Sequence, residues 1–172
     1  MCVGKANGAA DGGHRDRPLA YTALSILCFQ GAGYTHLEGP YRDPIQRGYE
    51  FILAGIDYDG SHQEKSWTFS YESAVLCQAL CDGYMLTGDR ALGEGAQRMI
   101  DYLVKIQYPG RTWRYAVRSS ETDTSVMSWI LLACISARSA GLDIPEQIFV
   151  ASEKWMDRAA DPVPDGEYEV FH

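Results

Sequence analysis

The sequence lacks any apolar run that approaches the roughly 20 residues needed to cross a bilayer. It also lacks a basic cluster: its 15 lysines and arginines are scattered among 23 acidic residues, and the net charge is -8. Nucleic acids and anionic membrane surfaces attract concentrated positive charge, so both are disfavoured as partners. The first five residues do not resemble the apolar core of a signal peptide, and we therefore expect a cytoplasmic protein.

The sequence has no even set of cysteines from which a disulfide framework could be built. Its five cysteines are Cys2, Cys28, Cys77, Cys81 and Cys134. Four of them lie inside apolar stretches with helical periodicity, so we expect buried, reduced thiols.

The 172 residues are 46% hydrophobic, which is enough for one globular domain with a real core. Residues 1–16 are rich in Gly and Ala and form a flexible lead-in by composition, whereas 161–172 reads as a turn-rich tail. The domain between them, 17–160, is predicted to be all-α. Its predicted helices are 17–32, 39–55, 70–86, 89–107, 123–140 and 143–160, and Asp143 is the expected N-cap of the last.

The predicted helices fall into two kinds that alternate along the chain. The second, fourth and sixth carry apolar residues on one face, at a period near 3.6 residues. The odd-numbered helices are apolar nearly all round, as in 74–81 and 126–135, which is typical of a helix surrounded by others.

The chain also repeats itself at a spacing near 50 residues. A shift of 51 superimposes Ala23 on Ala74, Gln46 on Gln97 and Arg47 on Arg98. A shift of 53 superimposes Gly88 on Gly141 and Cys81 on Cys134. Three helical hairpins stacked side by side, with inner and outer helices, indicate an α/α toroid or part of one.

One unit of this repeat resembles a known motif. It contains Arg98, Tyr102, Leu103, Gln107 and Trp113, and it resembles the glutamine–tryptophan repeat of squalene and terpenoid cyclases. The preceding unit has Ile56 where the glutamine belongs and His62 where the tryptophan belongs. The span from Pro18 to about Tyr168 is similar to the bacterial proteins called prenyltransferase and squalene oxidase repeat proteins. The phrases that carry this likeness are Thr22-Ala-Leu, Gly31-Ala-Gly-Tyr-Thr-His36, Trp113-Arg-Tyr115 and Asp123-Thr-Ser-Val126.

The resemblance implies a ring of six hairpins, of which this chain supplies three. It implies that Gln107 and Trp113 are structural, tying helix ends together. A half-ring leaves apolar flanks on its first and last hairpins, so we expect self-association.

Class II cyclases of this fold protonate an alkene with an Asp-x-Asp-Asp-Thr-Ala element at the start of an inner helix. The matching residues here are 120–125, where Thr122 replaces the acid that donates the proton. A hydroxyl is too weak an acid for that step. A shifted pair of Glu121 and Asp123 is a weak catalytic candidate; the alternative is that Asp123 or Thr122 caps the helix.

Other candidate site residues lie near the starts of the inner helices, where a toroid opens its cavity: Tyr71, Glu72, Tyr115 and Trp129. Aromatic side chains there could stabilise a carbocation or line a cavity for an isoprenoid-like ligand, or they could be core. Cys77, Cys81 and Asp82 do not reproduce the zinc motif of protein prenyltransferases. We expect no metal and no cofactor.

Two main hypotheses follow. The first is a repeat module without the cyclase acid motif or zinc ligands, acting as a scaffold or binding a small isoprenoid-like molecule. The second is an active terpenoid cyclase or transferase, completed by oligomerisation or by a missing half. A polysaccharide-acting toroid would need two carboxylates facing the cavity, and only Glu72 and Asp123 offer such a pair.

Overall fold

The computed structural model describes residues 17–63, 68–108, 111–115, 117 and 122–160, so the expectations for 1–16 and 161–172 lie outside the described residues. The described residues contain six helices and no strand, which confirms the all-α prediction. The helices are α1 (Pro18–Gly31), α2 (Arg42–Ala54), α3 (Phe69–Thr87), α4 (Arg90–Ile106), α5 (Thr124–Ser139) and α6 (Gln147–Ala160).

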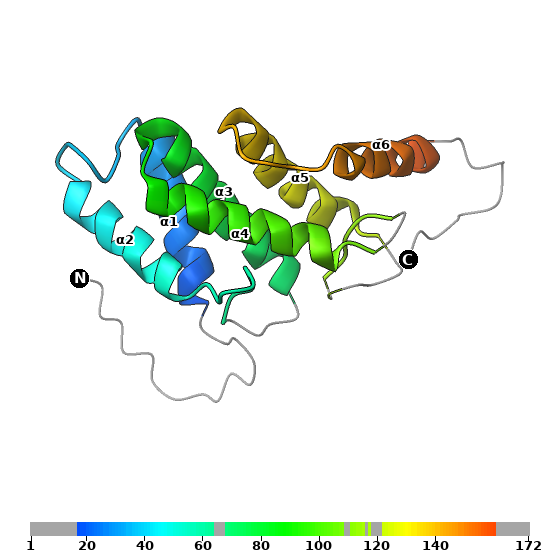
Figure 1. The fold of residues 1–172 in the computed structure, drawn as a ribbon, viewed down its shortest axis with the longest axis horizontal. Helices are drawn as coiled ribbons and strands as arrows, with labels where there is room; N and C mark the ends of the chain where they lie inside the picture. Colours follow the sequence, from blue (N-terminus) through cyan, green and yellow to red (C-terminus); the bar gives the residue numbers. More distant parts are fainter. Residues whose placement is uncertain (1–16, 64–67, 109–110, 116, 118–121, 161–172) are drawn as a thin grey trace, which may run out of the picture.

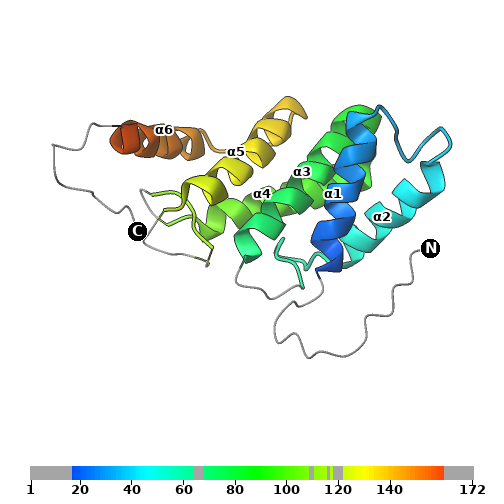
Figure 2. The same cartoon turned by 180° about the vertical axis from the view of Figure 1, so that it is seen from behind.

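The helices are arranged as pairs along the long axis of the molecule: α1 and α2 lie at one end, α3 and α4 in the middle, and α5 and α6 at the other end (Figure 1). Helix α3 packs against α1, α4 and α5, while α2 packs against α1 and α4. Seen from behind, α1, α3 and α5 form one row of neighbours (Figure 2). The starts of α1 and α3 follow the spacing of the repeat along the chain, because α3 begins at Phe69, 51 residues after α1 begins at Pro18.

The ends of three helices form at the residues that the sequence indicates. Gly88 ends α3 with a left-handed φ of 70°, and Gly141 follows α5 with φ 76°. Asp89 caps α4 by accepting a hydrogen bond from the backbone N–H of Ala91, and Asp123 caps α5 in the same way. The capping alternative for Asp123 is therefore confirmed.

The loop after α2 lies against α4 through a glycine contact. Gly60 has φ 84°, a conformation that other residues rarely adopt. A Cβ at Gly60 would lie 1.9 Å from the carbonyl oxygen of Arg98. The loop can therefore approach α4 this closely only with glycine at residue 60.

The core is centred on α3, which is buried along most of its length. The prediction that all odd-numbered helices are surrounded is correct for α3 and wrong for α1 and α5. Tyr21 and Leu24 of α1 are 60% and 41% exposed, and Leu132 and Ile135 of α5 are 47% and 53% exposed. The reason is positional, because α1 and α5 each have α3 as a neighbour on one side of the row only.

Two further expectations need correction. Cys28 is exposed because it lies on the open side of α1, whereas Cys77, Cys81 and Cys134 are buried thiols as predicted. Asp143 does not cap α6, which begins four residues later at Gln147. The backbone N–H and C=O of Asp143 instead exchange two hydrogen bonds, each 2.9 Å long, with the side-chain amide of Gln97 on α4.

Within the part of the chain that the structure describes, no helix has the length and apolar character that crossing a membrane requires.

Candidate functional site

Four residues with polar side chains meet where α3 and α5 begin. The Tyr71 hydroxyl is hydrogen bonded to Ser125, and the Ser125 hydroxyl donates to Asp123 Oδ1 at 2.6 Å. Tyr115, from the segment before α5, is hydrogen bonded to both Tyr71 and Asp123, and its ring centroid lies 5.7 Å from that of Tyr71. We call Tyr71, Tyr115, Asp123 and Ser125 the tyrosine–aspartate cluster. Three of its members were predicted as site residues; Ser125 was not singled out.

The cluster holds Asp123 as an anion. Partial burial raises the pKa of Asp123, but hydrogen bonds from the Ser125 side chain, the backbone of Val126 and Ser125, and Tyr115 outweigh burial and lower the pKa overall. The Asp123 carboxylate in turn raises the pKa of the Tyr115 phenol. At neutral pH the cluster therefore presents a carboxylate among hydroxyl groups.

An apolar seam runs from this cluster along the contact between α3 and α5. On α5, Ser125, Trp129, Leu132 and Ser136 follow one another at helical spacing and share one face. Both ends of this stripe are hydrogen bonded to α3, Ser125 through Tyr71 and Ser136 through Asp82. Between them, Trp129 and Leu132 are 37% and 47% exposed. We call Tyr71, Asp82, Ser125, Trp129, Leu132 and Ser136 the α3–α5 face.

The other candidates of the sequence lie elsewhere. Glu72 is 3% exposed, and its Oε1 lies 3.1 Å from Arg17 Nε and accepts a hydrogen bond from Thr68 Oγ1. Its carboxylate is thus used in joining the start of α1 to the start of α3. Glu121, the weak catalytic candidate beside Asp123, lies outside the described residues.

Gln107 and Trp113 stabilise the end of α4. The buried Trp113 indole N–H donates to the carbonyl oxygen of Leu103 at 2.9 Å, and the Gln107 amide donates to the carbonyl oxygen of Arg111 at 2.9 Å. His62, one repeat earlier than Trp113, is also fully buried and stacks on Phe69 with ring centroids 4.1 Å apart. Trp113 therefore holds the end of α4, and His62 holds the start of α3.

No metal centre forms among the residues that the structure describes, since no three His, Cys, Asp or Glu side chains gather there. The Cys77 and Cys81 sulfur atoms lie 3.9 Å apart inside the core. Their mutual contact and burial raise the pKa of Cys77, and burial raises the pKa of Cys134 to about 12. Thiols in that state are poor nucleophiles and metal ligands.

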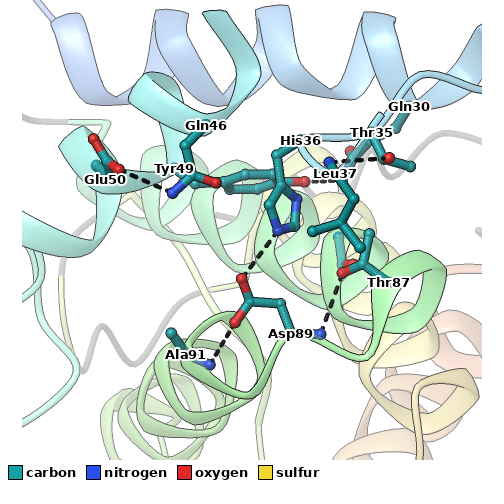
Figure 3. Close-up of polar contacts among 11 residues, drawn as sticks. Gln30, Thr35, His36, Leu37, Gln46, Tyr49, Glu50, Thr87, Asp89 and Ala91 are labelled. Atoms are coloured by element: carbon teal, nitrogen blue, oxygen red, sulfur yellow. Dashed lines mark hydrogen bonds and ion pairs between the residues drawn. The ribbon is translucent and has the colours of Figure 1, made fainter. Parts of the chain in front are cut away.

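A second polar cluster lies at the other end of α3, and the sequence did not single it out. His36, from the loop between α1 and α2, points its Nε2 at Asp89 Oδ2, 3.0 Å away (Figure 3). Its ring packs edge-on against Tyr49, whose hydroxyl accepts a 2.7 Å hydrogen bond from Gln30 Nε2. Burial raises the pKa of Tyr49 strongly. No local signal in the sequence could have found this cluster, because His36 and Asp89 lie 53 residues apart in the chain.

The two clusters differ in what they can do chemically. The His36 side chain is 2% exposed and the Tyr49 ring is buried, so ligands have little access to that end. The tyrosine–aspartate cluster is half-exposed and continues into exposed apolar side chains. Comparison of the chain with protein-family models, with curated proteins and with solved structures finds no match.

Proposed function

We propose that this chain is a helical-repeat module of the squalene-cyclase and prenyltransferase type that binds a long apolar, isoprenoid-like molecule along the α3–α5 face. The toroid-type arrangement of its hairpins is part of this proposal and rests on the sequence resemblance and the 51-residue repeat. The ligand role rests on the α3–α5 face itself.

One observation carries the ligand proposal: Trp129 and Leu132 are exposed side by side on a stripe whose two ends are polar. The stripe from Ser125 to Ser136 covers eleven helical steps, or about 16 Å at 1.5 Å per step. Exposed aromatic and aliphatic side chains framed by hydroxyl groups suit an elongated apolar ligand with a polar end.

The charge of the cluster favours a neutral polar group on the ligand. Asp123 is held as an anion, and the whole chain carries a net charge of -8. A diphosphate would meet like charge there and would find no basic cluster, whereas an alcohol could exchange hydrogen bonds with Tyr71, Tyr115 or Ser125. The proposed ligand class is therefore an uncharged polyprenol rather than a polyprenyl diphosphate.

The state of Asp123 also weighs against the cyclase alternative. A proton donor to an alkene must be a protonated acid, and the hydrogen bonds to Asp123 favour its ionised form. Thr122, at the position of the donor in the cyclase motif, is a buried hydroxyl. We therefore propose binding without proton transfer from these residues.

Native mass spectrometry of the purified protein with a polyprenol tests the proposal. We expect a retained polyprenol, weaker retention of the matching diphosphate, and at least about tenfold weaker binding for Trp129→Ala, since a buried indole contributes more than 1.4 kcal/mol to such a contact. Tyr58→Ala is the matched control, because Tyr58 is a 97% exposed aromatic residue on a loop. Equal binding by both variants contradicts the proposal.

An assay for turnover distinguishes ligand binding from the cyclase alternative. If the protein converts the polyprenoid to a cyclic product and Asp123→Asn abolishes that conversion, the chain is an enzyme. If the polyprenol is recovered unchanged from both proteins, the binding role stands.

A further inference from the structure

A groove of about 410 Å³ opens along the first hairpin, on the side of α1 and α2 away from α3 and α4. Its lining is mostly apolar: Pro18, Tyr21, Thr22, Ser25, Ile26, Phe29, Pro44, Ile45 and Gly48. We call this the edge groove. Its floor forms because Gly48 lets the two helices approach, since a Cβ there would lie 2.9 Å from Ile26 Cδ1. Its walls are open, and Tyr21 is 60% exposed.

The repeat shows what this groove corresponds to in the second hairpin. Four lining residues are exposed in the first hairpin: Pro18, Tyr21, Ser25 and Pro44. Their counterparts 51 residues later are Phe69, Glu72, Leu76 and Gly95, and all four are buried. The same surface of the repeat is thus open in the first hairpin and covered in the second.

The first hairpin is what covers this surface in the second. Arg17, at the start of α1, pairs with Glu72 at 3.1 Å. A Cβ at Gly95 would lie 2.6 Å from Leu53 of α2, so α2 packs directly on that residue. The edge groove is therefore the equivalent of a hairpin–hairpin interface that no other hairpin fills among the residues that the structure describes.

The opposite edge of the chain carries the other half of such an interface. The second hairpin faces the third through α3, where Tyr71 and Asp82 are hydrogen bonded to Ser125 and Ser136 of α5. A shift of 53 residues carries Tyr71 to Thr124 and Asp82 to Ile135. Thr124 is exposed and Ile135 is 53% exposed, so within the described part of the chain this side of α5 is also left open.

We propose that the edge groove binds the Thr124–Ile135 side of α5 from a second copy of this chain, head to tail. Both surfaces are halves of one interface that the chain already forms twice within itself, which is why a second copy fits better than an unrelated partner. Such a contact is heterologous: two copies can close on each other, or further copies can add in the same way. The proposal does not depend on ligand binding at the α3–α5 face.

Sedimentation of the wild-type protein and of the Tyr21→Arg variant, across micromolar concentrations, measures the strength of this contact between copies. We expect the wild-type mass to rise with concentration and the Tyr21→Arg dissociation constant to increase at least about tenfold, because a large cation would enter an apolar groove. Tyr58→Arg places the same change on a loop and should leave the mass unchanged. Circular dichroism shows whether each variant is folded. A wild-type protein that stays monomeric overturns the proposal and leaves the groove to another helical partner.

Disulfide trapping tests the geometry. Within the chain, Tyr71 of α3 contacts Ser125 of α5. Thr124 is the counterpart of Tyr71 after a shift of 53 residues. Tyr21 and Ser125 are both counterparts of Glu72, by shifts of 51 and 53 residues, so Tyr21 and Thr124 form the equivalent pair between two copies. In a background with Cys2 and Cys28 replaced by serine, we expect Tyr21→Cys protein mixed with Thr124→Cys protein to form a mixed disulfide dimer. Tyr58→Cys mixed with Thr124→Cys should not. Dimers formed by either single variant alone would indicate a face-to-face contact and overturn the proposal.

Discussion

Two aspartates cap helices near opposite ends of α3, and they differ in the partner of their second interaction. Asp89 Oδ1 accepts from the backbone of α4, and its Oδ2 lies 3.0 Å from buried His36. Asp123 Oδ1 accepts from the backbone of α5, and the carboxylate is also hydrogen bonded to Tyr115. The capping motif is the same, while the environment on its outer side is not.

The difference separates structural from functional use of one residue type. His36 comes from the loop of the first hairpin, so Asp89 joins two hairpins through a contact whose histidine side chain is buried. The hydroxyl groups around Asp123 are half-exposed and can exchange their partners for a ligand. The Asp89 end should therefore matter most for stability and the Asp123 end for binding.

Asp89→Ala should give the largest loss of stability. It removes the cap of α4, which costs about 1 kcal/mol, and it leaves the buried His36 Nε2 without its partner, which costs about 1–3 kcal/mol. We expect urea denaturation to show a loss of about 2–4 kcal/mol. Asp89→Asn is the control and should lose less, because its amide oxygen can still cap α4 and its amide N–H can donate to His36 Nε2 in the tautomer that carries the proton on Nδ1. Equal losses for the two variants would contradict this account.

Asp123→Ala should cost only the cap, about 1 kcal/mol, because Tyr71, Tyr115 and Ser125 are open enough to bond water instead. The same denaturation experiment measures it, with Asp123→Asn as the variant that keeps a capping side chain. A loss as large as that of Asp89→Ala would remove the distinction between the two ends.

His36→Leu should cost about 0.5–1.5 kcal/mol. It keeps the Asp89 cap and fills the buried site with an apolar side chain, so what is lost is the hydrogen bond and the packing on Tyr49. In a double-mutant cycle with Asp89→Ala, we expect a coupling of at least about 0.5 kcal/mol. Strict additivity of the two losses would mean that the 3.0 Å contact contributes nothing.

The smallest effect should be the pH dependence at Asp123. Its pKa is lowered in the folded protein, so the stability that this ionised group contributes is present above the ordinary carboxyl pKa of about 4 and is lost as pH falls through the lowered value. The stability difference between wild type and Asp123→Asn should shrink from pH 7 to pH 3. A difference that stays constant over that range contradicts the assigned shift.

Local signals predicted the helices well because their ends depend on a few neighbouring residues. Gly88, Asp89, Asp123 and Gly141 act through backbone conformation or a side chain within three residues, and each works as the sequence indicates. Asp143 was misassigned because its backbone is bound by Gln97, 46 residues earlier in the chain. Exposure of α1 and α5 depends on which neighbours exist, and apolar composition alone does not encode that.

The sequence predicted part of the candidate site, because several of its residues lie near helix starts, which local signals indicate. Tyr71, Tyr115 and Asp123 lie near the starts of predicted helices, which the fold brings together at one end of α3. Glu72 was grouped with them by sequence position, but adjacent residues of a helix point about 100° apart, and its side chain is buried beside Arg17. The contact between His36 and Asp89 spans 53 residues and joins two loops, so no local pattern indicates it.

The two hydrogen bonds between Gln97 and residue 143 use peptide groups only on the linker side. Any residue except proline supplies the same N–H and C=O, so the identity of residue 143 is unconstrained while the glutamine is not. Mutational tolerance should therefore be asymmetric across a single contact. At residue 143 the linker to α6 can therefore change its side chain and still be held in place by one side chain of α4.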